Sequence, residues 1–230
     1  KIKLIMKVCI FGYNLTSLAL AKALVKREIF VDLFYKKKNI KIDPTRTIGI
    51  SKSNIDYFNK DISNIKGMLW PIKKIKIFSE NSNNKELLKF EEKEDNLFSI
   101  LQNQKIFNQL VIELKKNKFF KFKKDIRYSK FTNLDYDLLI NCDSKNEITK
   151  KFFSKKFVKK YNSIAFTTII NHKKLSFNNE AIQVFTKDGP IAFLPISKEK
   201  TSIVYSLRVK KNKIDFGIKN IIKKFNPKYK

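Results

Sequence analysis

The chain has 230 residues, a formal net charge of +29 and 43% hydrophobic residues. This length can bury one large core or two small ones, and the hydrophobic content excludes a wholly disordered chain. Five glycines and five prolines leave no room for long linkers, and no run approaches the roughly 18 apolar residues of a membrane span. Met6 leads directly into the first predicted strand, so we expect no signal peptide and a soluble, cytoplasmic protein.

The positive charge is carried almost entirely by lysine. Of the 50 basic residues only four are arginine, namely Arg27, Arg46, Arg127 and Arg208. A nucleic-acid-binding protein usually concentrates its charge on one face and uses arginine for bidentate contacts. Lysines spread along the whole chain, together with abundant Asn, Ile and Phe, indicate a compositional bias and predict no specific nucleic-acid partner. Such a surface still attracts phosphates and anionic lipid without specificity.

The cysteine and histidine content argues against a metal site. Cys9 and Cys142 lie in or at the end of apolar runs, which predicts two buried thiols in a reducing compartment. His172 is the single histidine, so the sequence offers no Cys/His cluster that could bind zinc. We therefore expect no structural or catalytic metal.

The first predicted elements form a β-α-β unit. Residues 7–11 are a short apolar run typical of a buried strand, and Gly12 with Asn14 marks a tight turn. Apolar residues then recur at helical spacing over 15–26, and residues 29–34 form a second apolar strand. A strand, a helix and a strand within about 30 residues predict a parallel pair joined by a right-handed crossover.

The middle of the chain changes character. Residues 71–78 alternate apolar and basic side chains, as a half-buried strand does, and a polar turn at 81–84 leads to a predicted hairpin partner at 86–90. Residues 97–115 return to helical spacing. Residues 136–140 predict another buried strand, which ends before the polar residues that follow it.

The last third of the chain is rich in predicted strands, at 163–170, 180–185, 191–196 and 201–207. We therefore predict an α/β fold in which a Rossmann-like α/β layer is interleaved with a mostly antiparallel β-sheet domain. The predicted boundaries are 1–67 and 97–160 for the α/β domain, 68–96 and 161–212 for the β-sheet domain, and 213–230 for the start of a C-terminal helical region or tail.

The turn after the first strand is a partial match to a nucleotide-binding motif. A dinucleotide-binding turn has the pattern Gly-x-Gly-x-x-Gly, which lets the backbone and the helix N-terminus approach the pyrophosphate. Residues 12–17 retain only Gly12, although Ser17 is small enough for close helix packing and Asn14 tolerates positive φ better than most residues. Tyr35 stands where an acid for the ribose hydroxyls is expected, and Asp32 lies too early to replace it. An α/β unit that binds no nucleotide fits this turn equally well.

Further signatures follow in a recognisable order. They are Arg46 within 45–51, then residues 67–72, 101–104, 137–144 and 185–195, the last of which reads Phe-x-x-x-Gly-Pro-x-Ala-x-Leu-Pro. The region 161–207, which includes Asn171 and His172, is the most informative part. This succession resembles the FAD-dependent aromatic-ring hydroxylases, and most closely the branch that hydroxylates ubiquinone precursors.

The resemblance implies an FAD bound along the α/β layer and an antiparallel sheet that covers the substrate. In that family NAD(P)H reduces FAD, and the reduced flavin uses O2 to hydroxylate an electron-rich ring, while the protein orients the cofactor and excludes water. The implied substrate is a prenylated phenol or quinone precursor. The resemblance also allows partners from a biosynthetic complex and a peripheral contact of this cytoplasmic protein with the inner membrane.

The family's cofactor-binding positions can be matched at the start of the chain. The resemblance places Gly12 at the pyrophosphate, with Asn14 and Ser17 in place of the second and third glycines. Tyr35 takes the position of the ribose acid, and Arg46 is expected on the flavin side of the site.

The remaining matched positions lie further along. Asn103 and Gln104 begin the helix that helps to hold FAD, with Gln104 where an arginine is usual. Asp143 matches the acid of an Asp-Gly motif, and Gly189 with Pro190 forms a turn on the substrate side. No catalytic residue is assigned.

These departures support a second hypothesis, in which a non-catalytic relative keeps the fold as a scaffold or accessory subunit of a biosynthetic complex. The sequence also ends at Lys230, before the family's C-terminal Gly-Asp motif, and does not begin with Met. We therefore expect either the front part of a longer protein or a shortened relative. A nucleic-acid-binding protein is a third and less favoured hypothesis.

Overall fold

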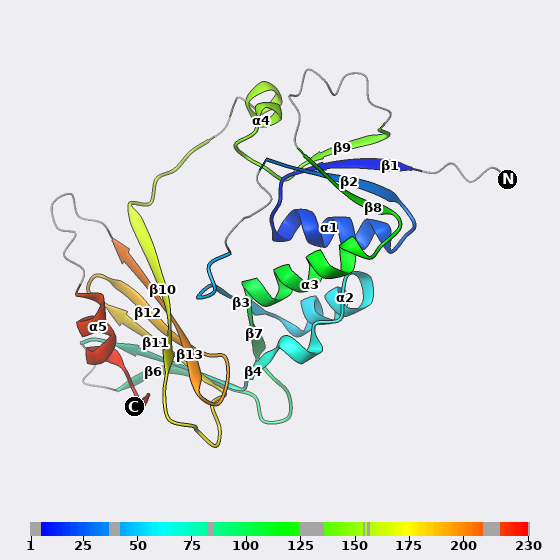
Figure 1. Cartoon of the computed structure of the whole chain (residues 1–230). Helices are drawn as coiled ribbons and strands as arrows, with labels where there is room; N and C mark the ends of the chain where they lie inside the picture. Colours follow the sequence, from blue (N-terminus) through cyan, green and yellow to red (C-terminus); the bar gives the residue numbers. More distant parts are fainter. Residues whose placement is uncertain are drawn as a thin grey trace. The chain divides into compact units, whose positions relative to one another are not determined.

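The computed structural model describes residues 6–36, 42–81, 85–124, 136–153, 155, 157–208 and 217–229 (Figure 1). The chain divides into two compact units, and it passes from one to the other five times. The first unit comprises Lys1–Asp43, Ile55–Gly67 and Asn103–Val158, and the second comprises Pro44–Asn54, Met68–Gln102 and Lys159–Lys230.

The first unit contains a parallel sheet of four strands in the order β8-β2-β1-β9. The strands are β1 (Lys7–Phe11), β2 (Phe30–Tyr35), β8 (Phe120–Lys124) and β9 (Leu138–Asn141). The predicted parallel pair is confirmed, because Lys7 pairs with Phe30 and Phe11 pairs with Phe34. Residues 8–11 are almost fully buried, which is typical of a central strand in a parallel sheet.

Two helices cover one side of this sheet (Figure 1). They are α1 (Leu15–Val25) and α3 (Asn103–Lys115), which contact each other through buried apolar faces. Lys22 of α1 and Glu113 of α3 form an ion pair at 2.8 Å across the contact. The unit also contains the short helix α4 (Glu147–Phe152) and most of α2 (Lys52–Asp61).

The second unit contains a sheet of six strands in the order β10-β13-β12-β11-β5-β6. All neighbours are antiparallel except β5 and β11, which are parallel. The strands are β5 (Lys74–Ser79), β6 (Glu86–Glu91), β10 (Ser163–Asn171), β11 (Glu180–Thr186), β12 (Gly189–Pro195) and β13 (Lys200–Arg208). The predicted hairpin of 71–78 with 86–90 is therefore present as β5 with β6.

A three-stranded sheet in the order β3-β7-β4 completes the second unit. Its strands are β3 (Thr47–Ile50), β4 (Trp70–Ile72) and β7 (Phe98–Gln102), and the single-turn helix η1 (Lys66–Met68) precedes β4. The predicted strand 71–78 is thus two strands in two sheets. The strand is interrupted at Lys73, whose N–H donates to the carbonyl of Asn179 at 2.9 Å.

The predicted helix 97–115 is wrong over its first residues. Residues 98–102 form β7, which pairs with both β3 and β4, and the helix begins at Asn103. Ile100 and Leu101 are both buried although they point to opposite faces of the strand. Pairing on both edges and burial on both faces therefore override the helical spacing. Residues 44–54 and 97–102, which the predicted boundaries assign to the α/β domain, belong to the second unit.

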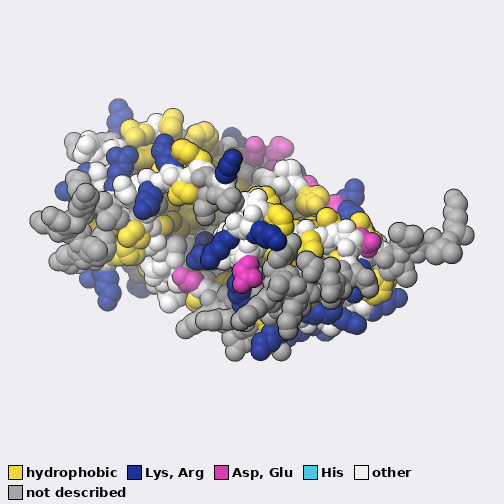
Figure 2. Space-filling view, turned by 90° about the horizontal axis from the view of Figure 1, so that it is seen from above, with side chains coloured by type: hydrophobic (Ala, Val, Ile, Leu, Met, Phe, Trp, Pro, Cys, Tyr) yellow, Lys and Arg dark blue, Asp and Glu magenta, His cyan; other side chains and the backbone are white. Residues whose placement is uncertain are grey.

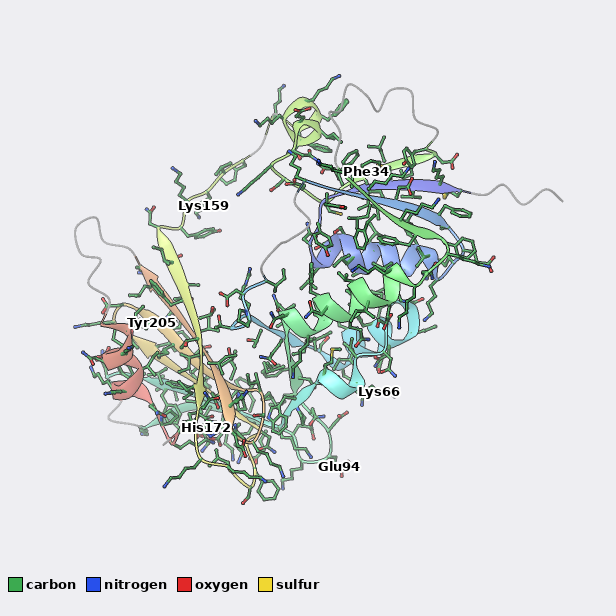
Figure 3. All side chains as sticks on the ribbon, viewed as in Figure 1. Phe34, Lys66, Glu94, Lys159, His172 and Tyr205 are labelled. Carbon is green, nitrogen blue, oxygen red and sulfur yellow. The ribbon has the colours of Figure 1, made fainter. Side chains whose placement is uncertain are left out.

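The core of the second unit lies between the six-stranded sheet and α5 (Ile218–Phe225). Tyr205 of β13 is one of its largest fully buried side chains (Figure 3). The opposite face of the same sheet contacts the small sheet through Ile72, Ile100 and Ala181. The mixed α/β class predicted from sequence is confirmed, and none of the described helices is long and apolar enough to cross a bilayer.

Lysine and arginine side chains are scattered over the surface. In the view of Figure 2 they lie among hydrophobic and acidic side chains, and those described on this face form no single basic stripe. Cys9 is buried and Cys142 is half-buried, and neither forms a disulfide bond.

Candidate functional site

The turn between β1 and α1 is built around Gly12. Its φ is +111°, and a Cβ at this position would lie 3.1 Å from the carbonyl carbon of Cys142. The N–H of Gly12 donates to the carbonyl of Phe34 at 3.0 Å, and the N–H of Cys142 donates to the carbonyl of Phe11 at 2.8 Å. The ends of three neighbouring strands therefore leave space only for glycine here.

Asn14 caps α1 in extended conformation, with φ −145°. Its Oδ1 accepts from the N–H of Ser17 at 3.0 Å, and Ser17 Oγ accepts from the N–H of Asn14 at 3.0 Å, which is a capping box. Asn14 Nδ2 also donates to the carbonyl of Cys142 at 2.8 Å. The positive φ that we expected Asn14 to tolerate is therefore carried by Gly12, and Asn14 instead closes part of the turn.

Ser17 is fully buried, so it occupies the close-packing position between helix and sheet. Its N–H is already bonded to Asn14, which leaves the N–H groups of Leu15 and Thr16 outside the capping box. Thr16 is exposed to solvent. An anion at the start of α1 could therefore bind these two N–H groups but not that of Ser17.

Tyr35 at the end of β2 belongs to an aromatic cluster. Its ring lies 6.0 Å from that of Tyr13 and 6.1 Å from that of Phe122, and Tyr13 also contacts Phe107 of α3 at 5.2 Å. Burial, and to a lesser extent Tyr35, raises the pKa of the Tyr13 hydroxyl. Aromatic rings therefore occupy the place where the sequence motif expects a carboxylate for ribose.

Asp32 does not supply that carboxylate. It points to the face of the sheet opposite to Tyr35, because successive side chains of a strand alternate. Its buried Oδ2 accepts from the hydroxyl of Tyr136 at 2.6 Å and lies 2.8 Å from Lys123 Nζ. Burial, together with the hydrogen bond to Asp32, raises the pKa of Tyr136, so this hydroxyl stays protonated.

Asn103 and Gln104 form the first turn of α3. The Gln104 side chain is exposed, whereas Asn103 Oδ1 is buried and has no hydrogen-bond partner among the described residues. A buried acceptor without a partner is unusual in a folded protein and is the kind of group that a ligand donor satisfies.

Asp143 follows β9 and organises the turn into α4. Its Oδ1 accepts from the N–H of Lys145 at 2.9 Å, and its carbonyl accepts from the Thr149 hydroxyl at 2.9 Å. Asp143 is adjacent to Cys142, whose carbonyl contacts Asn14. The structure thus brings the β9–α4 turn and the β1–α1 turn together at one edge of the sheet.

In the second unit, Arg46 lies on a segment held against the six-stranded sheet. The flanking Thr45 hydroxyl is 2.6 Å from that of Thr167 on β10, and the Thr47 hydroxyl is 3.4 Å from that of Ser202 on β13. Both partners belong to the sheet face opposite α5, because their strand neighbours face the α5 core. The Arg46 side chain is exposed.

The predicted turn at Gly189 and Pro190 is wrong by two residues: Lys187 and Asp188 form the turn between β11 and β12, and Gly189 and Pro190 begin β12. Gly189 has φ +143°, and a Cβ there would lie 1.9 Å from the carbonyl oxygen of Ser206. The Thr186 hydroxyl donates to the Gly189 carbonyl at 2.7 Å. Pro190 pairs with Phe185, which is 46% exposed, and these two share the sheet face that carries the Arg46 segment.

The middle of this face is a row of small or uncharged side chains across four strands, Thr167, Val204, Ala192 and Gln183. All four are half-buried, so the row forms a flat and partly open floor. A planar, weakly polar ring suits such a floor better than a charged ligand does.

The predicted residues therefore fall into two groups, one in each unit. Gly12, Asn14, Ser17 and Asp143 meet at the ends of β1 and β9, and Arg46, Gly189 and Pro190 share one face of the second unit's sheet. Tyr35, Asn103 and Gln104 belong to the first unit, where α3 contacts Tyr13 through Phe107. Sequence reasoning missed the carbonyl of Cys142 and the ring of Tyr13. The signal available for Tyr13 was its position, because this aromatic residue lies within the turn motif itself.

Comparison with known proteins places this arrangement in a structural class. No family model and no curated protein sequence matches the chain. Among solved structures, HpxO of Klebsiella pneumoniae, complexed with FAD and uric acid, has a TM-score of 0.72 at 12% identity, over 95% of this chain and 61% of that one. The p-nitrophenol 4-monooxygenase PnpA of Pseudomonas putida DLL-E4 has a TM-score of 0.69 at 11% identity, over 95% and 61%.

A third structure, the 2,6-dihydroxypyridine-3-hydroxylase of Arthrobacter nicotinovorans, has a TM-score of 0.67 at 11% identity, over 90% of this chain and 57% of that one. The chain therefore spans less than two thirds of the length of these proteins. At this identity the likeness defines the fold, which is that of the FAD-dependent aromatic monooxygenases.

Proposed function

We propose that the protein is an FAD-dependent monooxygenase that uses NAD(P)H and O2 to hydroxylate an aromatic quinone precursor. The observation that carries the proposal is the β1–α1 turn. A buried parallel strand ends at Gly12 with positive φ and opens onto the N-terminus of a helix, in a fold shared with proteins solved with FAD. This is the arrangement that brings a dinucleotide pyrophosphate close to backbone N–H groups.

The residues present fit such a cofactor in part. Gly12 allows the close approach, and the N–H groups of Leu15 and Thr16 can donate to phosphate oxygens. Asn103 Oδ1 is a buried acceptor that a donor group of the cofactor could satisfy. Tyr35 offers ribose an aromatic edge instead of a carboxylate. Bound FAD would supply the redox chemistry with oxygen, which no side chain of the chain can supply.

The sheet face with Arg46, Phe185 and Pro190 supports an aromatic substrate. Its floor of small side chains can hold a ring flat and exclude water from one side of it. Arg46 is exposed on a segment held against this face, and we assign it to anionic groups of the cofactor or substrate. We infer a quinone-precursor substrate from the sequence resemblance alone.

Substitution of Arg46 tests this assignment. Arg46→Ala should weaken FAD binding about tenfold, because a charge-assisted hydrogen bond is lost, with little change in stability. FAD affinity is measured by titration of flavin fluorescence, and the visible spectrum of the purified protein reports the bound fraction. Arg27→Ala, which removes the same charge just after α1 and not on this sheet face, is the control. Equal affinities for both variants would remove Arg46 from the site.

A second candidate function is that of a cofactor-free scaffold or accessory subunit in a biosynthetic complex. Asn14 favours it, because its side chain bridges Ser17 and Cys142 across the turn that the pyrophosphate would approach. On this hypothesis the purified protein is colourless and co-purifies with partner enzymes.

Restoring the glycine separates the two candidates. If Asn14 blocks the site, Asn14→Gly should bind added FAD while the native protein does not. If the native protein already binds FAD at close to one per chain, the scaffold hypothesis is wrong. Asn14→Ser, which keeps a cap but removes the amide that donates to Cys142, shows whether the bridge or the cap matters.

A further inference from the structure

Residues 150–161, which we call the basic aromatic segment, have an unusual composition. Their sequence is Lys-Lys-Phe-Phe-Ser-Lys-Lys-Phe-Val-Lys-Lys-Tyr, so pairs of lysines alternate with pairs of large apolar residues. No acidic residue occurs from position 148 to position 179, and this is the longest stretch of the chain without one. The basic aromatic segment lies within it. Residues 115–124 also interleave lysines with phenylalanines, but there Phe120 is buried and Phe119 and Phe122 pack against other aromatic rings.

The apolar side chains of the segment are exposed. Phe157 is 92% exposed and Phe153 is 62% exposed, and Phe152, Val158 and Tyr161 are each more than half exposed. The described residues after Phe152 and before β10 lie outside helices and strands, so the side chains project from an extended stretch. Lys159 projects from the same stretch (Figure 3). Contiguous exposed apolar side chains of this size mark a surface that binds something.

A pocket adjoins the start of the segment. Its volume is about 440 Å³, and it is lined by Leu139, Asn141, Ile148, Phe152 and Phe153. Asn141 is its one polar side chain, and both ends of the amide are already bonded. Oδ1 accepts from Asp143 N and Asn146 Nδ2, and Nδ2 donates to the Thr149 hydroxyl. The pocket therefore offers mainly apolar contact, and the Asn141 amide is bonded within the protein.

We propose that the basic aromatic segment docks the protein onto an anionic lipid bilayer. Lysine pairs would lie among the lipid headgroups, Phe153, Phe157 and Val158 would enter the boundary of the acyl chains, and the pocket would receive part of one chain. Charge and apolar area act together in such peripheral binding, and neither alone is sufficient. None of the described helices is long and apolar enough to span a bilayer.

A single-stranded nucleic acid is the competing partner for lysines interleaved with aromatic rings. Two features favour lipid. The segment contains no arginine, which is the residue best suited to phosphate forks and base stacking. The lining of the neighbouring pocket is mainly apolar, which suits an acyl chain better than a polar base edge.

Vesicle co-sedimentation of the full chain tests the proposal without any need for flavin or substrate. The protein should bind vesicles of phosphatidylcholine mixed with phosphatidylserine, bind vesicles of phosphatidylcholine alone weakly, and dissociate as salt is raised. Phe157→Ser should weaken binding about tenfold or more, because one large apolar side chain is no longer inserted. Phe177→Ser is the matched control, since Phe177 is 83% exposed and lies elsewhere in the same acid-free stretch.

The lysines are tested by charge-matched variants. Replacing Lys155, Lys159 and Lys160 together by Gln should weaken binding by about fivefold for each lysine. The control is the same change at the exposed Lys105, Lys115 and Lys116, in and just after α3, which should have much less effect.

Insertion has its own optical signal. Tryptophan emission of Phe157→Trp should shift to shorter wavelength on anionic vesicles and be quenched by brominated acyl chains, while that of Phe177→Trp should not change. Equal loss of binding in the segment and control variants would overturn the proposal. So would tight binding of single-stranded RNA, without vesicle binding, that is lost in Phe157→Ser.

Discussion

Gly189 shows most directly how one residue fixes the geometry of the substrate-side face. Its φ of +143° is a conformation that side chains rarely adopt, and a Cβ there would lie 1.9 Å from the carbonyl oxygen of Ser206 on β13. Neither the hairpin nor the neighbouring strand can move without disturbing the pairing of β12 with β13. The glycine of the sequence signature is therefore a requirement of the hairpin whatever the sheet binds.

We expect Gly189→Ala to lower the free energy of unfolding by about 3 kcal/mol, since backbone strain adds to the clash with Ser206. Urea unfolding followed by circular dichroism measures the change. Gly67→Ala is the control, because a Cβ at Gly67 meets nothing within 4 Å, and we expect it to change stability by less than about 0.5 kcal/mol. A mild effect at Gly189 would mean that the hairpin can relax.

At the same scale, the roles of the turn residues were only half predictable. The need for glycine at position 12 followed from the motif, but its physical cause is a carbonyl from β9, more than a hundred residues away along the chain. The sequence showed only that Asn14 could tolerate a positive φ; in the structure it caps the helix in extended conformation and bridges to the same carbonyl. Local motifs carry no information about which distant backbone group fills the space above a turn.

At the scale of elements, the strands and helices with one clean period were predicted well. Residues 7–11 and the helix that follows appear as expected, because burial on both faces and helical spacing were unambiguous there. Residues 97–102 were not, because Ile100 and Leu101 fit the helical spacing of the residues after them while pairing decided their conformation. The split at Lys73 was equally hidden, since it depends on a hydrogen bond to Asn179.

The edge hairpin of β5 and β6 is stabilised by cross-strand ion pairs. Glu91 of β6 lies 2.8 Å from Lys74 of β5 and 2.5 Å from Lys89. The hydrogen bond to Lys74, followed by that to Lys89, lowers the pKa of Glu91 to about 2. A carboxyl whose pKa is lowered by folding stabilises the protein above its ordinary pKa of 4.5 and loses that effect as pH falls towards 2.

Glu91→Gln should therefore lower the melting temperature at neutral pH, and the difference from the native protein should close between pH 4.5 and pH 2. Thermal unfolding at a series of pH values measures it. Glu94→Gln makes the same charge change in the adjoining loop (Figure 3) and serves as the control. A difference that persists at pH 2 would show that Gln disturbs packing and not charge.

At the scale of the whole molecule, each of the two compact units is formed from three separate stretches of the chain, and the domain boundaries drawn from the sequence stay a prediction. The boundaries depend on strands such as β3 and β7, whose partners are far away in sequence. Fold likeness at 11% to 12% identity does not define the substrate class or any membrane or protein partner. The experiments proposed above test them.

The parallel pairing of β5 with β11 has a consequence for synthesis of the protein. Lys74 pairs with Glu180, so the β5–β6 hairpin leaves the ribosome long before the strand that flanks it exists. At ordinary elongation rates the wait is several seconds, far longer than a hairpin takes to form. During that time Ile75, Ile77 and their neighbours have no further strand to pair with, so the nascent chain exposes an unpaired apolar edge. Chaperones that bind exposed strands should meet this protein during translation and leave it once β11 has emerged.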